Sequence, residues 1–146
     1  MIAGVILAAG DSSRMGFPKQ LAEYKGKTIL ETVVDTVTSN LEETVVVLGH
    51  ENDTITEKLD FKESTILINE NWEEGIVSSI RTALFYLSEN NEIDSAMIFM
   101  ADQPSVNNKI IDKLIKTKKK DDEVVISKYR YKLNYPIIVP KYFWSK

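Results

Sequence analysis

Residues 2–19 read IAGVILAAGDSSRMGFPK and carry the strongest structural signal in the sequence. Residues 2–9 form a short apolar run, and residues 10–19 form a polar loop with two glycines and two cations. An apolar run that breaks into such a loop predicts a buried strand that ends at a ligand-binding edge of a sheet.

The loop has the chemistry of a phosphate site. Gly10 and the second glycine let backbone N–H groups turn toward a ligand, Ser12 and Ser13 add hydrogen-bond donors, and Arg14 and Lys19 add positive charge. Ordinary surface cations are the alternative, but their position in a glycine-flanked loop after a buried strand favours a polyphosphate ligand. The sequence therefore predicts a nucleotide-binding protein.

Neither common phosphate loop is present. A Walker A loop needs four residues between its glycines and a lysine directly after the second, whereas five residues separate Gly10 from Gly16 here. The G-x-G-x-x-G pattern of dinucleotide-binding proteins is also absent after the first strand. The loop belongs to another class of nucleotide site.

The remaining apolar segments alternate between strand and helix patterns. A capping box at Thr28 and Glu31 opens a helix that is expected to end near Asn40. Further helices are expected at residues 76–87 and 110–115 with a weaker one near 55–59, and further strands at residues 45–48, 65–68, 96–100 and 124–126. Apolar strands separated by helices predict an α/β fold: a three-layer sandwich with a mostly parallel, Rossmann-like doubly wound sheet.

Composition limits the function classes. The 146 residues are 43% hydrophobic and suggest a single domain over residues 1–146. A net charge of -4 argues against a general nucleic-acid binder, and no apolar run approaches the ~20 residues needed to cross a membrane. The chain lacks cysteine, which excludes disulfides, thiolate zinc sites and a cysteine nucleophile and is compatible with the cytoplasm.

Three polar or glycine-rich segments follow expected strands: residues 10–19, 69–79 and 101–104. Ligands of doubly wound sheets bind beyond the carboxyl ends of the strands, so these segments are expected to converge in space.

At these segments the chain resembles a known family. Residues 7–16 with Lys19 are similar to the LAAGxSxRMGxxK signature of the MobA-like nucleotidyltransferases. Residues 71–75 followed by Ser78 and Ser79 resemble the second block of that family, and residues 102–104 resemble the third. The resemblance covers essentially the whole chain, implies a fold of the nucleotide-diphospho-sugar transferase type, and points toward molybdenum cofactor cytidylyltransferases.

The resemblance implies transfer of CMP from CTP to molybdopterin with release of pyrophosphate, and a molybdoenzyme as a possible protein partner. LAAG at residues 7–10 is typical of the cytidylyl branch, where the Ala9 methyl group would crowd the base pocket and favour a pyrimidine over guanine. Asp102 is the expected ligand of Mg²⁺, and Arg14, Lys19 and Asp102 are the expected catalytic residues. The implied nucleotide-binding residues are Leu7, Ala8, Ala9, Gly10, Ser12, Ser13, Arg14, Lys19, Gly75, Ser78 and Ser79.

Several residues have structural alternatives. Asp102 could instead cap a helix, although Ser105 or Asn107 is the more natural cap, and Ser78 and Ser79 could simply be small residues in a packed helix. Trp72 is expected to anchor the core rather than to provide a stacking platform. His50, the only histidine, is expected to be a loop residue.

The functional alternatives concern the acceptor. Residues 135–144 resemble the last strand of the family, but Asn134 precedes them without the usual glycine, and the given sequence ends at Lys146. The resemblance therefore implies an acceptor-binding end that is incomplete, through truncation or divergence. Nucleotidyl transfer to another phosphorylated acceptor and a non-catalytic nucleotide-binding maturation module both remain open.

Overall fold

The computed structural model describes residues 1–9, 23–24, 26–49, 55–56, 59–103, 106–120, 122–129 and 132–144. Its main sheet has six strands in the order β5-β4-β1-β6-β8-β7, and a small ribbon pairs β2 with β3. The strands are β1 (Ile2–Ala8), β2 (Glu23–Tyr24), β3 (Lys27–Thr28), β4 (Glu43–Leu48), β5 (Thr65–Ile68), β6 (Ser95–Met100), β7 (Val125–Tyr129) and β8 (Lys132–Pro140). The helices are α1 (Ile29–Asn40), α3 (Ile76–Leu87) and α4 (Asn108–Thr117), with 3₁₀ turns η3 (Trp72–Glu74) and η4 (Lys141–Phe143).

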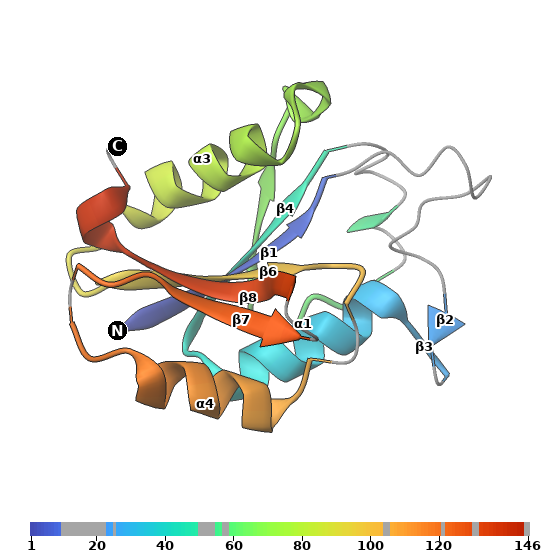
Figure 1. Cartoon of the computed structure of the whole chain (residues 1–146). Helices are drawn as coiled ribbons and strands as arrows, with labels where there is room; N and C mark the ends of the chain where they lie inside the picture. Colours follow the sequence, from blue (N-terminus) through green and yellow to red (C-terminus); the bar gives the residue numbers. More distant parts are fainter. Residues whose placement is uncertain are drawn as a thin grey trace.

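The sheet is the middle of three layers. Helix α3 covers one face, and α1 and α4 cover the other (Figure 1). Strand β1 is central and runs parallel to β4 and β6, and β4 runs parallel to β5. The expected three-layer α/β sandwich with a mostly parallel sheet is confirmed. Within the described ranges, no helix combines the length and the apolar character that crossing a bilayer requires.

Side chains of β1 alternate between the two faces. Ile6 and Ala8 belong to the cluster under α1 and α4, whereas Leu7 and the following Ala9 belong to the cluster under α3. This alternation is the period of two that a strand imposes on its side chains. The alternation therefore places Leu7 and Ala9, and not Ile6 and Ala8, on the face of the sheet that α3 covers.

The start of α1 follows the expected capping pattern. Thr28 is the N-cap, and its Oγ1 accepts a hydrogen bond from the backbone N–H of Glu31 at 3.2 Å. The hydroxyl group of Thr28 also donates to Glu31 Oε1 at 2.8 Å. The pair thus satisfies one of the free N–H groups at the helix terminus, and the helix ends at Asn40 as the sequence predicted.

Close packing sets the position of α1 over the sheet. A Cβ atom added at Gly4 would lie 2.6 Å from Val37 Cγ1 and 3.1 Å from Leu41 Cδ1. Only a residue without a side chain lets the helix approach β1 this closely. The glycine inside the apolar run of β1 therefore serves helix packing.

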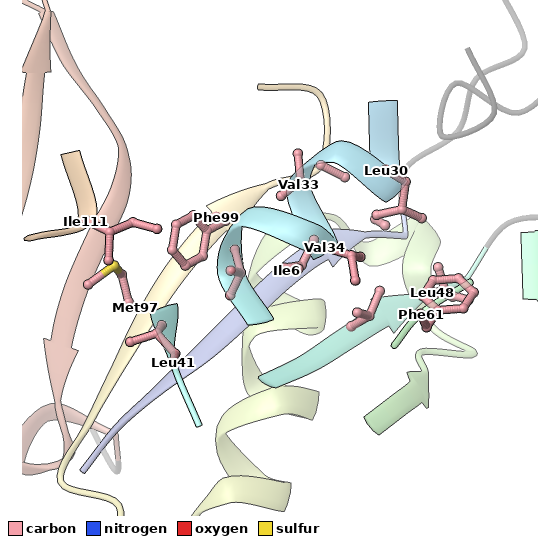
Figure 2. Close-up of a cluster of buried hydrophobic side chains, with 14 of the residues drawn as sticks. Ile6, Leu30, Val33, Val34, Leu41, Leu48, Phe61, Met97, Phe99 and Ile111 are labelled. Atoms are coloured by element: carbon pink, nitrogen blue, oxygen red, sulfur yellow. The ribbon is translucent and has the colours of Figure 1, made fainter. Parts of the chain in front are cut away.

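The larger core lies between the sheet and the pair of helices α1 and α4. Figure 2 shows Phe99 of β6 among side chains from β1, α1 and α4, including Ile6, Val33 and Ile111. Phe99, Ile6 and Ile111 have no exposed surface. This dry, interlocked cluster holds β6 beside β1, and the two strands carry their carboxyl ends to the same edge of the sheet.

The sequence did not predict the direction of one strand, and one predicted strand boundary differs by a residue. Strand β8 runs antiparallel to both β6 and β7, so the sheet is mixed at this side. Val124 was expected to begin a strand, but β7 begins at Val125 and the Val124 side chain is exposed. An apolar run predicts a buried strand without giving its direction, which depends on the length and path of the connection.

Candidate functional site

A cavity of about 300 Å³ opens at the carboxyl ends of β1 and β6. Chain connections diverge here: β1 leads through α1 toward β4, whereas β6 leads through α4 toward β7 and β8. Such a switch point is the usual ligand crevice of a doubly wound sheet. The cavity is lined by Leu7, Ala9, Trp72, Glu73, Gly75, Ile76, Ser79 and Met100.

The floor of the cavity comes from the two central strands. Leu7 of β1 pairs in register with Met100 of β6, and the backbone N–H of Ala101 donates to the carbonyl of Leu7 at 3.1 Å. Ala9 follows β1 and is 5% exposed. Ala8 lies between these residues in sequence but faces the opposite core, so its methyl group does not line the cavity.

A buried carboxamide fixes the wall on the α3 side. Asn69 follows β5 and is 4% exposed, and its Nδ2 donates to the hydroxyl oxygens of Ser78 at 2.9 Å and Ser79 at 3.0 Å. Its Oδ1 accepts the backbone N–H of Asn71 at 3.0 Å. One side chain therefore ties the segment that contains η3 to the first turn of α3.

The two predicted serines differ in role. Ser79 is buried and lines the cavity. The Ser78 hydroxyl lies 2.7 Å from the carbonyl oxygen of Gly75 and 3.1 Å from that of Asn71, and donates to one of them at a time. Ser78 is therefore engaged with the backbone that shapes the wall and is not among the lining residues.

Gly75 forms the bend between η3 and α3. Its φ of 101° and ψ of -175° lie in a region that residues with a side chain rarely adopt. The residue caps α3 without a side-chain hydrogen bond and lines the cavity. A Cβ atom at this position would meet nothing within 4 Å. The glycine is therefore required by the backbone conformation and not by a lack of space.

Asp102 lies in the turn after β6, two residues beyond the lining residue Met100, and is exposed. The turn is closed by the backbone N–H of Gln103, which donates to the carbonyl of Met100 at 3.2 Å. Asn107 caps α4 and accepts from the backbone N–H of Ile110 at 3.1 Å. The helix-cap role considered for Asp102 is thus filled by Asn107.

The carboxylate of Asp102 is the type of ligand that magnesium prefers in proteins. Within the part of the chain that the structure describes, no three His, Cys, Asp or Glu side chains gather into a ready-made metal cage. Mg²⁺ is commonly held by one or two carboxylates and completes its coordination shell with phosphate oxygens and water. The exposed carboxylate of Asp102, in the turn two residues beyond the lining residue Met100, is compatible with this mode.

The cavity brings together Leu7, Ala9, Gly75 and Ser79 of the predicted set. Outside the described residues lie Gly10, Ser12, Ser13, Arg14 and Lys19, together with His50 and Ser105. The sequence did not identify Glu73, Ile76 and Met100 as lining residues. It also did not identify Asn69 as the residue whose hydrogen bonds to Ser78 and Ser79 hold the wall. Their positions in or beside the strand-end segments were the available signal.

The curated proteins that this chain resembles are named for different activities. The probable molybdenum cofactor guanylyltransferase of Bacillus cereus is 32% identical over 127 residues, which are 85% of this chain and 60% of that protein. The nicotine blue oxidoreductase of Paenarthrobacter nicotinovorans is 28% identical over 116 residues, 78% of this chain and 55% of that protein. The chain thus spans little more than half the length of these relatives, and the molybdenum cofactor relative is named for guanylyl rather than cytidylyl transfer.

Solved structures confirm the fold. Rv0371c from Mycobacterium tuberculosis superposes with a TM-score of 0.86 at 22% identity, covering 99% of this chain and 73% of that one. The same protein has also been solved in a complex with manganese. The family model of the MobA-like NTP transferase domain matches residues 4–146, from the first strand to the last residue of the sequence. The match confirms the resemblance seen in the sequence, and this chain belongs to the MobA-like NTP transferase family.

Proposed function

We propose that this protein transfers CMP from CTP to a phosphorylated acceptor of the molybdopterin type and releases pyrophosphate. The observation that carries the proposal is the cavity at the switch point, which joins Ala9, Gly75 and Ser79 beside the turn that bears Asp102. Membership of the NTP transferase family supports the class of reaction. The choice of a molybdopterin-type acceptor is based on the family resemblance and on the name of the Bacillus cereus relative.

The chemistry of the cavity favours the base over the phosphates. Its described walls are mostly apolar, and the one charged side chain among its lining residues is the acidic Glu73. A volume of about 300 Å³ is at the small end for ligand pockets, so it suits a base better than a whole nucleotide. We assign the triphosphate to the loop at residues 10–19, where Arg14 and Lys19 supply the positive charge.

The proposed reaction is a direct displacement. An acceptor phosphate oxygen attacks the α-phosphorus of CTP, a new P–O bond forms, and the bond to the bridging oxygen of the leaving pyrophosphate breaks. Arg14 and Lys19 hold the triphosphate and stabilise the negative charge that grows on pyrophosphate. Asp102 would hold a magnesium ion, which when bound neutralises charge on the phosphate oxygens. The protein supplies position and charge, and no covalent enzyme intermediate is needed.

Lys19→Ala tests the assignment of the phosphate loop. The variant is expected to bind CTP more weakly with little change in Tm, because the removed charge is assigned to the ligand and not to the packing of the fold. Calorimetric titration with CTP measures the affinity, and pyrophosphate release measures turnover. Lys116→Ala, which removes an exposed lysine at the end of α4, is the matched control and should bind like the wild type. Unchanged affinity in Lys19→Ala would refute the loop assignment.

The base preference depends on the Ala9 methyl group, which lines the cavity. CTP is expected to raise Tm more than GTP at equal concentration, since a ligand stabilises the native state by RT ln(1 + [L]/Kd). Ala9→Gly should reduce this difference by an amount on the order of 1 kcal/mol, the usual effect of one methyl group in a pocket. Ala8→Gly is the control, because the Ala8 methyl group faces the other core.

GTP is the second candidate nucleotide, because a molybdenum cofactor relative is named for guanylyl transfer. A larger Tm shift with GTP than with CTP would assign the protein to that branch. Pyrophosphate release with acceptors other than molybdopterin would change only the acceptor. Nucleotide binding without pyrophosphate release for any acceptor would favour the non-catalytic maturation module.

A further inference from the structure

Trp72 lies where the core meets the cavity. It is the first residue of η3, is half-buried, and packs against the cluster under α3 while also lining the cavity. The core contact agrees with the expected anchor role of this side chain. The position on the cavity wall also fits the alternative considered for Trp72, a stacking platform for a ligand.

Trp72 packs directly against the backbone of Gly49. Gly49 directly follows β4, and a Cβ atom added there would lie 2.6 Å from Trp72 Cβ, 2.9 Å from Cγ and 3.0 Å from Cδ1. Real side chains do not tolerate such distances, so any other residue at position 49 would have to displace the tryptophan. The absence of a side chain at Gly49 thus determines where the indole ring sits.

Hydrogen bonds of Asn69 hold the segment that contains η3 next to Gly49. Its backbone N–H donates to the carbonyl of Leu48 at 2.7 Å, next to Gly49 in sequence. Its carboxamide binds Asn71 on one side and the two serines of α3 on the other. The backbone on both sides of Trp72 is therefore fixed by hydrogen bonds.

We propose that Trp72 is a base-binding residue whose ring contacts the nucleobase, and that Gly49 and Asn69 are positioning residues that act through it. This inference rests on the proposed function, which assigns the base to the cavity. Leu7, Ala9 and Met100 give the cavity an apolar floor, and a planar wall beside it fits a planar heteroaromatic ring. Contact between an aromatic ring and a base strengthens binding without hydrogen bonds and tolerates any base.

The indole ring also provides a direct optical test. The chain has two tryptophans, and Trp144 lies past β8, whose last residue, Pro140, pairs with Ser95 at the opposite end of β6 from Met100. In a Trp144→Phe protein, CTP and GTP should change the fluorescence of Trp72 in a saturable way. Inorganic tripolyphosphate, which has no base, should leave the fluorescence unchanged. Equal responses to nucleotide and tripolyphosphate would overturn the proposal.

A double-mutant cycle tests whether Gly49 acts through Trp72. Trp72→Leu and Gly49→Ala should each raise the Kd for CTP about tenfold, the scale of one base–aromatic contact, and Trp72→Phe should keep most of the affinity. The double variant should bind no worse than Trp72→Leu. A double variant whose Kd for CTP is the product of the two single effects, about a hundredfold above the wild type, would contradict the inference. A Trp72→Leu protein that binds CTP like the wild type would contradict it as well.

The outcomes separate this inference from the proposed function. A wild-type protein that binds no nucleoside triphosphate would refute both. Pyrophosphate release by a protein in which Trp72 gives no fluorescence response to CTP would refute the role of the indole and leave the proposed function standing. If Gly49→Ala fails to fold, the fluorescence titration and the comparison of Trp72→Leu with Trp72→Phe still decide.

Discussion

Asp102→Asn is expected to lower the rate of pyrophosphate release about 100-fold or more at saturating Mg²⁺. A metal ion that polarises a phosphoryl oxygen contributes several kcal/mol to the transition state, and each 1.36 kcal/mol corresponds to about a tenfold change in rate. Part of the affinity for CTP should persist, because the contacts of the phosphate loop remain. Pyrophosphate release followed against Mg²⁺ concentration, with CTP affinity measured separately, distinguishes the two effects.

Asp112→Asn is the matched control for this experiment. Asp112 is exposed on α4, away from the lining residues of the cavity, so the substitution removes the same charge without touching the site. Its activity should equal that of the wild type. Wild-type activity in Asp102→Asn as well would mean that another residue holds the ion.

Phe99→Ala is expected to reduce the free energy of unfolding by about 3–5 kcal/mol, the usual loss for a buried phenylalanine. Phe99 has no exposed surface and lies in the core under α1 and α4 (Figure 2). Because domains are stable by only about 5–15 kcal/mol, the loss is a large share of the total, and Tm should fall by roughly 10 °C. Urea titration and thermal melting of the two proteins measure the effect.

Phe85→Ala removes the same ring from a different environment. Phe85 lies on α3 and is 76% exposed, so its removal should change the free energy of unfolding by less than about 0.5 kcal/mol. Similar losses in the two variants would mean that the core under α1 and α4 is not the main source of stability.

The fold was largely predictable because its elements have strong local patterns. The Thr28–Glu31 cap, the helical spacing of the apolar residues in α3 and the β-branched run in β4 are properties of short segments. The direction of β8 was not predictable in this way. A run of apolar residues carries no information on strand direction, which depends on pairing with β6 and β7 and so on contacts that join distant parts of the chain.

The site was predictable in outline and less so in detail. Segments that follow parallel strands meet at one edge of a sheet, which is why Ala9, Gly75 and Ser79 could be expected near one another. The face on which a residue lies and the partner of a hydroxyl group depend on register and packing. For this reason the sequence does not show that the Ala8 methyl group and the Ser78 hydroxyl group lie away from the cavity lining, or that the Asn69 carboxamide holds the wall.

The place of β8 in the sheet has a consequence for synthesis on the ribosome. This strand is the last one in the described sequence but lies inside the sheet, between β6 and β7. At usual translation rates, roughly 2 to 8 seconds pass between the synthesis of Met100 and that of Pro140. The two segments leave the ribosomal tunnel with about the same delay, and until β8 follows, the backbone N–H and C=O groups on one edge of β6 have no strand beside them. An open strand edge of this kind can pair with another chain. Shielding by a chaperone would matter most in that short period.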